Sequence, residues 1–149
     1  MPQSAGLLLF RDTPAGREVL LVHPGGPFWA KKDDGAWSIP KGEYDAAEDP
    51  LAAAKREFEE ELGTAPEGAF VRLEPIRQKG GKVVEAWAVC GGFDVTALKS
   101  NQFELEWPPR SGRRQSFPEV DRAAWFGMAE ARRKILPSQL PLLDQITHV

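Results

Sequence analysis

The sequence predicts an α+β fold, with a mixed sheet flanked by helices, in a single domain that spans residues 1–149. Apolar runs at 5–10 and 18–23 predict buried strands, and a helical pattern of apolar residues at 50–62 predicts a helix. The predicted strands and helices do not alternate regularly, so a doubly wound parallel fold is not expected. A chain of this length can bury one sizeable core.

Local patterns and turn residues place the other elements. Gly, Pro and charged residues at 24–35 predict a loop, and 36–40 is a short strand candidate. Further strands are predicted at 69–78, 82–93, 102–107 and 122–127, and helices at 128–136 and 140–147. KGGK at 79–82 is predicted to be a turn, and PPRSGRRQ at 108–115 a basic loop.

The composition is that of an ordinary globular protein, with 42% hydrophobic and 28% charged residues. The net charge of −3 does not indicate general affinity for nucleic acid. The single cysteine, Cys90, can form no intrachain disulfide and is expected to be a small buried strand residue. No segment has the length and apolarity of a membrane span, and the N-terminus lacks the basic region of a signal peptide. We therefore expect a soluble, cytoplasmic protein without a membrane or stable protein partner.

The acidic segment GEYDAAEDPLAAAKREFEEELGT, residues 42–64, contains the predicted helix. Asp49 before Pro50 is a typical helix start, with the aspartate as N-cap and the proline at the first helical position. Gly63 is a typical helix stop. On a helical wheel, one apolar stripe is expected to face the core: Leu51, Ala54, Phe58 and Leu62.

Three glutamates of this helix fall together on one flank of the wheel, namely Glu57, Glu60 and Glu61, while Glu59 falls on the opposite flank. Like charges at these spacings each destabilise an exposed helix by about 0.2–0.5 kcal/mol, and burial increases the cost. Bound Mg²⁺ or Mn²⁺ would turn this repulsion into attraction, because both ions take carboxylate oxygens as ligands. A solvated acidic face is the alternative interpretation. No His or Cys lies nearby, so a zinc site is not expected.

Gly42, Glu48 and REFEEELGT at 56–64 resemble the Nudix box, the signature of the Nudix hydrolases. Phe58 fills an apolar position of that pattern, and Thr64 stands where an aliphatic residue is usual, which is a mild departure at a packing position. The resemblance implies the Nudix fold. This fold is an α/β/α sandwich in which a mixed curved sheet has the box helix on one side and C-terminal helices beside it.

The resemblance also implies metal-dependent hydrolysis of a nucleoside diphosphate linked to another moiety, with Mg²⁺ or Mn²⁺ as the cofactor. The family's metal ligands correspond to four positions: Gly42, through its carbonyl, Glu57, Glu60 and Glu61. Arg56 is implied as a residue that supports catalysis, through an ion pair with Glu48 that orients the ligands. Plain surface charge is the alternative for this pair.

Attack of water on a pyrophosphate requires a base for the proton and cations for the remaining phosphates. Two residues are base candidates: Glu60, and Glu119 in FPEVDRAAWF, which resembles a loop and strand of the dinucleoside polyphosphate hydrolases. Four cations near the box and the KGGK turn are candidate phosphate contacts: Lys41, Arg77, Lys79 and Lys82. Each of the four could instead be an ordinary surface residue, and Glu119 an ordinary turn residue.

The sequence resembles most the diadenosine polyphosphate hydrolases and the bacterial NTP pyrophosphohydrolases near them. A small nucleotide, either a dinucleoside polyphosphate or a nucleoside triphosphate, is therefore the leading substrate. The tyrosine that often stacks a base in the dinucleoside enzymes is missing, since the single tyrosine, Tyr44, lies inside the box. Four aromatic residues could stack a base in its place: Phe28, Trp29, Trp87 and Trp107.

Two other functions stay open. The basic loop at 108–115 could bind a polyphosphate tail, inositol phosphates or the 5′-triphosphate end of an RNA. An RNA 5′ pyrophosphohydrolase or an inositol-pyrophosphate phosphohydrolase is therefore an alternative within the enzymes. A regulatory Nudix domain that binds nucleotides without hydrolysis is the alternative from another class. Such domains usually lose box carboxylates, and this sequence keeps all three.

Overall fold

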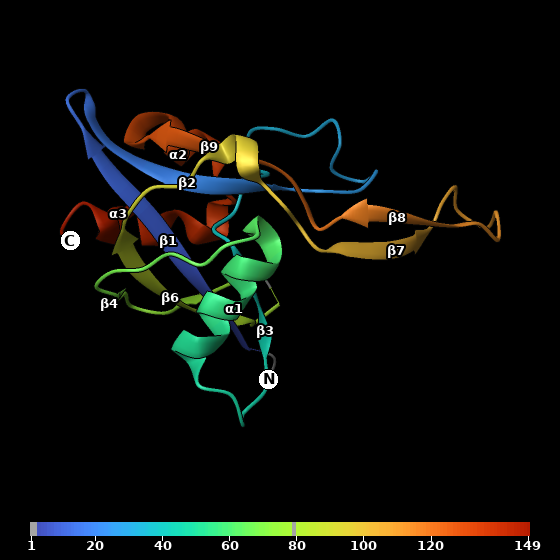
Figure 1. Ribbon diagram of the computed structural model, residues 1–149, viewed down its shortest axis with the longest axis horizontal. Coiled ribbons are helices and arrows are strands. Elements are labelled where there is room, and N and C mark those ends of the chain that lie inside the picture. Colours follow the sequence, from blue (N-terminus) through green and yellow to red (C-terminus); the bar gives the residue numbers. More distant parts are fainter. Residues whose placement is uncertain (1–2, 79) are drawn as a thin grey trace.

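The computed structural model describes residues 3–78 and 80–149. Its centre is a mixed sheet with the strand order β4-β6-β1-β2-β9 (Figure 1). In addition, β3 pairs with β1, and β5 pairs with β6. The strands are β1 (Gln3–Thr13), β2 (Gly16–Pro24), β3 (Lys41–Tyr44), β4 (Val71–Arg72), β5 (Ile76–Arg77), β6 (Val83–Cys90) and β9 (Val120–Gly127). β1 and β6 run parallel, and the other described pairings of this sheet are antiparallel.

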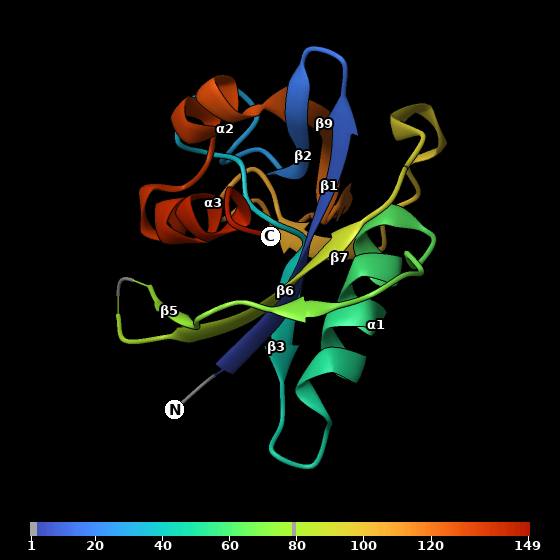
Figure 2. The same ribbon diagram turned by 90° about the vertical axis from the view of Figure 1, so that its left-hand side faces the viewer.

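Helices cover both faces of the sheet. α1 (Pro50–Leu62) lies on one side, and α2 (Met128–Lys134) and α3 (Leu140–Ile146) lie on the other (Figure 2). The 3₁₀ helices η1 (Val95–Ala97) and η2 (Pro137–Gln139) lie in connecting segments. The predicted α+β architecture, an α/β/α sandwich with C-terminal helices, is confirmed.

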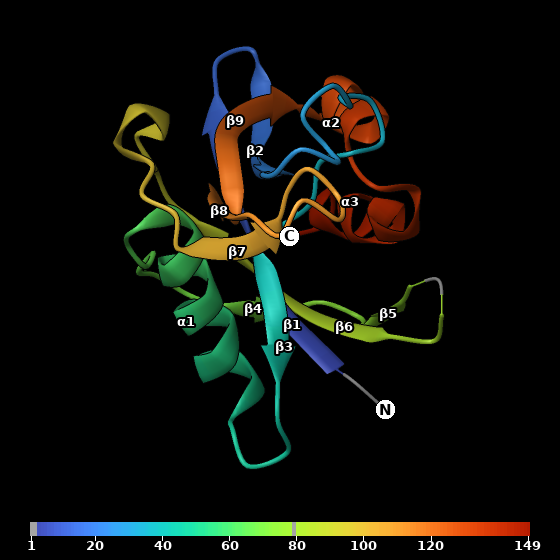
Figure 3. The same cartoon turned by 90° about the vertical axis from the view of Figure 1, so that its right-hand side faces the viewer.

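A second sheet contains only β7 (Gln102–Glu106) and β8 (Arg114–Pro118). This hairpin projects away from the body of the molecule (Figure 1). Figure 3 looks at the molecule from the side to which the hairpin points, with α1 and the two C-terminal helices on opposite sides. The hairpin therefore stands apart from both layers of helices.

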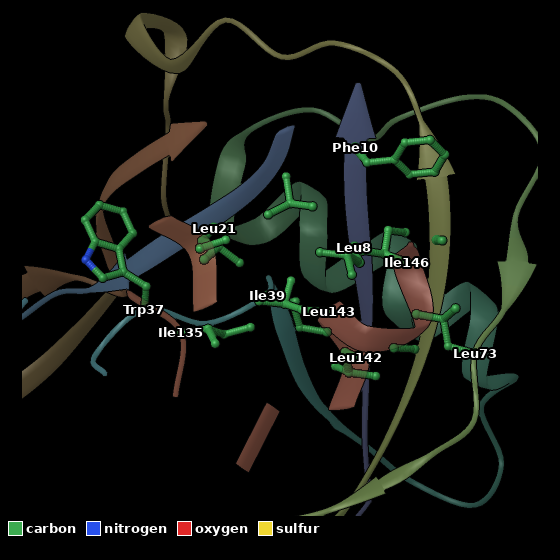
Figure 4. Packing of buried hydrophobic residues seen from close by; sticks show 14 of the residues in the cluster. Leu8, Phe10, Leu21, Trp37, Ile39, Leu73, Ile135, Leu142, Leu143 and Ile146 are labelled. Carbon is green, nitrogen blue, oxygen red and sulfur yellow. The ribbon is translucent and has the colours of Figure 1, made fainter. Parts of the chain in front are cut away.

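Two apolar cores lie on the two faces of the sheet, because successive side chains of a strand point to opposite faces. On one face Leu8 packs with Leu142 and Ile146 of α3 (Figure 4). On the other face Leu7 packs with Phe58 of α1. Full burial of such a side chain stabilises the fold by about 1.5–3 kcal/mol, so both layers of helices are held by the same strand.

The limits of α1 are those predicted from its caps. The Asp49 carboxylate accepts a hydrogen bond from the Ala52 N–H at 3.0 Å, and Pro50 is the first helical residue. Gly63 has φ 95°, a left-handed conformation that favours glycine, and its N–H donates to the Glu59 carbonyl at 2.8 Å. Three of the four residues of the predicted apolar stripe are buried, and Leu51 is half-buried. The helix is therefore placed by its local signals.

The strand predicted at 82–93 ends already at Cys90, and two other strand predictions are wrong in their extent because of prolines. Segment 36–40 makes only isolated bridges, and β3 begins at the next residue because Pro40 has no N–H to donate to a ladder. Segment 69–78 is divided into the short strands β4 and β5, with Pro75 between them. Neither interruption changes the order of the sheet.

Three smaller predictions also need correction. Cys90 is exposed, not buried, because it is the last residue of β6, where the strand leaves the sheet. The basic loop 108–115 is shorter than predicted, since Arg114 already belongs to β8. The helix predicted at 128–136 ends at Lys134. Lys79 of the predicted turn lies outside the described residues.

No helix among the described residues combines the length and the apolar character needed to cross a membrane.

Candidate active site

The site begins where α1 lies against β3. Glu57 of α1 is only 8% exposed. A Cβ atom added to Gly42 of β3 would lie 2.0 Å from the Glu57 carboxyl carbon. Because no side chain fits there, the glycine allows the carboxylate of Glu57 to rest on bare backbone. The glycine at position 42 is therefore required sterically, because any side chain there would overlap the Glu57 carboxylate.

Arg56 connects three carboxylates of the segment. Its Nε and Nη2 donate to both oxygens of Glu48, at 2.8 and 2.9 Å. Its Nη1 donates to Glu57 at 2.9 Å and to Glu60 at 3.3 Å. The two-pronged contact fixes the plane of the guanidinium group, so Glu48 orients Arg56, and Arg56 orients the two helix glutamates.

A cavity of about 220 Å³ opens beside the C-terminal half of α1. Three charged groups from different parts of the chain line it: Glu61 of α1, Lys41 of β3 and Glu119, which lies between β8 and β9. Four apolar residues complete much of its wall: Val22, Trp29, Ile39 and Leu136. An apolar cavity with a few convergent charged groups is the usual form of a ligand site.

The carboxylates around this cavity are unusually hard to ionise. Burial, and then the charges of Glu57 and Glu119, raise the pKa of Glu61 to about 8. Burial and the charge of Glu60 raise the pKa of Glu57, although Arg56 opposes this shift. Partial desolvation, followed by the charge of Glu60, raises the pKa of Glu119. Perturbed acids that share a cavity are a common property of functional sites.

The half-buried Lys41 is the cation of the cavity. Desolvation is the main cause that lowers the pKa of Lys41, and the charge of Lys82 lowers it further. Glu61 acts in the opposite direction. Lys41 and Lys82 are thus close enough to repel each other, and an anion bound between them would relieve this repulsion.

The donor set of α1 fits a hard divalent cation, although it is not gathered into a finished site. Among residues 3–78 and 80–149, no three Asp, Glu, His or Cys side chains form a ready-made metal cluster. Arg56 lies between Glu57 and Glu60 and offsets their charge. Carboxylate oxygens are the ligands that Mg²⁺ and Mn²⁺ prefer, and a bound cation would relieve both the repulsion and the desolvation that raise the pKa values of Glu57 and Glu61.

The other predicted phosphate contacts lie outside this cavity. Lys82 pairs with Glu43 at 3.4 Å and lines a second cavity of about 400 Å³. Arg77 is exposed on β5 and donates to the Gly81 carbonyl at 3.3 Å. Lys79 lies outside the described residues. Of the three candidates that the structure describes, Lys41 lies in the cavity with Glu61 and Glu119, and Lys82 lies near Lys41.

Asn101 was not predicted to belong to the site. Its N–H donates to the Glu60 carbonyl and its carbonyl accepts from the Glu119 N–H, both at 2.8 Å. One residue therefore joins the backbones of the two base candidates. No local pattern marks such a residue, because its contacts come from segments that are distant in sequence.

His23 is a second residue that the sequence analysis did not single out. It is fully buried, with Nδ1 2.8 Å from Asp121 of β9 and Nε2 2.6 Å from the carbonyl oxygen of Lys32. It thus ties the loop after β2 to β9, and that loop carries Trp29 of the cavity wall.

A curved mixed sheet between helices, with an acidic helix beside a charged cavity, defines the class of this protein. The protein belongs to the NUDIX domain family, which matches residues 1–146. This finding confirms the resemblance that the box indicated. The metal-ligand and catalytic roles of single residues stay predictions.

Comparison with individual proteins shows a partial relative and several neighbours in fold. The RNA pyrophosphohydrolase of Rhodospirillum rubrum is 44% identical over 66 residues, which cover 42% of this chain and 38% of that protein. The chain thus matches well under half the length of that relative.

Among solved structures, the Caenorhabditis elegans Ap4A hydrolase has a TM-score of 0.67 at 22% identity, covering 97% of this chain and 96% of the other. The NUDIX domain of Shewanella oneidensis NrtR, in a complex with ADP ribose, has a TM-score of 0.65 at 18% identity, covering 98% and 86%. At these identities the two structures establish a shared fold.

Proposed function

We propose that this protein hydrolyses the pyrophosphate bond of a nucleoside diphosphate linked to another moiety, with Mg²⁺ or Mn²⁺ as the cofactor. A dinucleoside polyphosphate or a nucleoside triphosphate is the leading substrate. The observation that carries the proposal is the cavity shared by Glu61, Glu119 and Lys41. This arrangement supports the proposal, because the reaction requires carboxylates for a cation and a base beside a positive group for phosphate. Membership of the NUDIX domain family supports the same reaction.

The cation would be held by four groups of the box: Glu57, Glu60, Glu61 and the carbonyl of Gly42. When bound, it supplies the positive charge that lets water attack the phosphorus of a polyanion. The chain itself positions these ligands. Gly42 leaves room for the Glu57 carboxylate, and Arg56, anchored on Glu48, holds Glu57 and Glu60 in place.

Glu119 is the leading candidate for the base, with Glu60 as the second. Glu119 lines the cavity, and partial desolvation raises its pKa towards the range in which a general base works best. Glu60, in contrast, contacts Arg56. The pH profile distinguishes the two, because replacing the true base by glutamine removes the acidic limb of the kcat/KM profile.

Two adjoining cavities support a substrate with two ends. Leu136 lines the cavity that contains Lys41 and also the second cavity, which contains Lys82 and Gln78. A phosphate chain that runs between the two lysines would place one nucleoside against the wall that includes Trp29. This arrangement favours a dinucleoside polyphosphate over a shorter nucleotide.

A second candidate function is RNA 5′ pyrophosphohydrolysis. The observation in its favour is the 44% identity to the RNA pyrophosphohydrolase of Rhodospirillum rubrum over 66 residues. The reacting group would be the same, since a 5′-triphosphate end also presents a pyrophosphate bond to the carboxylates.

Incubation with a substrate panel and detection of released phosphate test the proposal. The panel contains dinucleoside polyphosphates, canonical and oxidised nucleoside triphosphates, ADP-ribose and 5′-triphosphate RNA. We expect turnover with Mg²⁺ or Mn²⁺, none with a chelator, and almost none in the Glu60→Gln variant. The matched control is Glu59→Gln, because Glu59 is exposed on the same helix and should keep full activity. Nucleotide binding without turnover would instead indicate a regulatory domain.

A further inference from the structure

The β7–β8 hairpin, residues 102–118, has no place in the cavity described above, and we call it the arm. Within residues 3–78 and 80–149 it pairs with no strand of the main sheet, and it projects from the body (Figure 1). Its near end, however, is connected to the site. Asn101 precedes β7 and Glu119 follows β8, and the Glu119 N–H donates a hydrogen bond of 2.8 Å to the Asn101 carbonyl. The arm therefore begins and ends next to Glu119, the leading candidate for the general base.

Arginines gather at the far end of the arm. Arg110, Arg113 and Arg114 are exposed, and none of the ion pairs found among the described residues includes them. Glu106, at the end of β7, accepts the backbone N–H of Arg110 at 3.0 Å and so helps to hold the turn. The guanidinium groups are left available for an anionic ligand.

Aromatic side chains accompany these arginines. Phe28, in the loop after β2, is 61% exposed, and its ring meets that of Trp107 edge-on with 5.4 Å between centroids. Closer to the body of the molecule, the tilted rings of Phe103 and Phe117 lie with 6.0 Å between their centroids. One exposed ring and three half-buried rings thus lie on or against the hairpin that carries the arginines. Aromatic rings combined with arginines form the kind of surface on which single-stranded nucleic acid stacks its bases and neutralises its phosphates.

The length of the arm selects among polyanions. Arg114 lies five positions before Glu119. Five steps along a strand span about 17 Å, or on the order of five stacked nucleotides at about 3.4 Å each. We therefore expect a single nucleotide with its phosphates at Glu119 to fall short of Arg114, and a nucleic acid chain of several residues to reach it. A second copy of the protein is a poorer partner, because a symmetric contact between two arms would bring like charges together.

We propose that the arm binds single-stranded RNA a few nucleotides downstream of a 5′ end held at the carboxylates. This inference rests on the second candidate function, RNA 5′ pyrophosphohydrolysis. It makes the arm the part of the protein that selects an RNA chain over a free nucleotide. Arg110, Arg113 and Arg114 contact the phosphates, and Phe28 and Trp107 stack on bases.

The test measures binding and turnover separately. Binding of fluorescent 5′-monophosphate RNAs of 2, 4, 8 and 12 nucleotides is followed by anisotropy without divalent metal. The arm variant carries Arg110→Ala, Arg113→Ala and Arg114→Ala together. Arg132→Ala is the control, because Arg132 is exposed on α2 and pairs with Asp144. Circular dichroism and sedimentation verify the fold and the oligomeric state of each variant.

We expect the affinity to rise with RNA length up to about six nucleotides and then to level off. The arm variant should bind the 12-mer at least about tenfold more weakly, and its log–log salt slope should be smaller by about 0.7 for each lost phosphate contact. Arg132→Ala should bind as the wild type does. The ratio of kcat/KM for triphosphate RNA to kcat/KM for a free triphosphate should fall about tenfold in the arm variant.

Equal affinity for the 2-mer and the 12-mer, or an arm variant that binds the 12-mer normally, would overturn the inference. So would an arm variant that only converts a dimer into a monomer, since this result assigns the arm to self-association. The proposed function fails separately, if no member of the substrate panel is hydrolysed. Length-dependent RNA binding through the arm would still support the binding role in that case.

Discussion

The acidic site and the arm differ in almost every physical property. At the site, Glu57 and Glu61 are each 8% exposed, and a glycine is required because Glu57 fills the space of a Cβ atom. In the arm, Arg110 and Arg113 of the turn and Arg114 of β8 are exposed, and among the described residues β7 and β8 pair with each other alone. The packed region can therefore hold a fixed reaction geometry, whereas the exposed region is free to vary with the ligand.

The largest effect should come from removing the apolar support of the site. Phe58 of α1 is 1% exposed and lies with its ring centroid 6.3 Å from that of Phe93. Phe58→Ala is expected to lower the free energy of unfolding by about 3–5 kcal/mol. Urea denaturation measures this change, and a loss of less than 1 kcal/mol would show that α1 is not held by this contact.

The next effect is a dependence of stability on pH in metal-free protein. The pKa of Glu61 is about 8 in the folded state, against 4.5 for an ordinary glutamate. Between these values the folded state keeps a proton that the unfolded state has lost, so stability is fully present at low pH and falls as pH rises through about 8. We expect a loss on the order of a few kcal/mol, measured by denaturation in EDTA.

Two variants isolate the contribution of Glu61 to that slope. Glu61→Gln should flatten it, whereas Glu59→Gln, exposed on the opposite flank of α1, should leave it unchanged. Mg²⁺ should stabilise the wild type increasingly as pH rises, because metal binding requires the deprotonated carboxylate. A wild-type slope identical to that of Glu61→Gln would refute the prediction.

A smaller loss of stability, with a large loss of activity, is expected for Gly42→Ala. The added methyl group overlaps the Glu57 carboxylate, so overpacking should cost about 1–3 kcal/mol and displace a proposed ligand. Gly127→Ala is the matched control, because a Cβ atom there has nothing within 4 Å and its φ is −63°. Turnover and thermal unfolding of the two variants give the comparison, and equal activity would place Glu57 outside the site.

The smallest change in stability is expected in the arm region. Phe28 is 61% exposed, so Phe28→Ala should alter the free energy of unfolding by no more than about 0.5 kcal/mol. The difference between the effects of Phe58→Ala and Phe28→Ala on the free energy of unfolding measures how much more the packed region contributes to stability than the arm region does. A destabilisation above about 2 kcal/mol would mean that the aromatic contact with Trp107 stabilises the fold rather than a ligand.

Elements with strong local signals could be predicted from the sequence. The limits of α1 follow from Asp49, Pro50 and Gly63, which act within one turn of the helix. The long strands β1, β2, β6 and β9 follow from apolar runs, whereas β3 (Lys41–Tyr44) contains no such run and was not predicted. The extents at 36–40 and 69–78 were wrong because Pro40 and Pro75 interrupt pairing that the apolar pattern would otherwise support.

The parts that could not be predicted depend on contacts between distant segments. The ion pair of Arg56 with Glu48, which the resemblance to the Nudix box implied, is present. Asn101, in contrast, is placed by α1 and by the start of β9, and nothing in its neighbourhood marks it. The exposure of Cys90 depends on where β6 leaves the sheet, which an apolar pattern does not indicate.

The two hydrogen bonds of Asn101 also have a dynamic consequence. Because its N–H donates to the last turn of α1 and its carbonyl accepts from Glu119, we expect Glu60, Glu119 and the start of the arm to move together. A ligand that restrains the arm would therefore also restrain Glu60 and Glu119. Long substrates would in this way stabilise the position of the residues proposed to act in their hydrolysis.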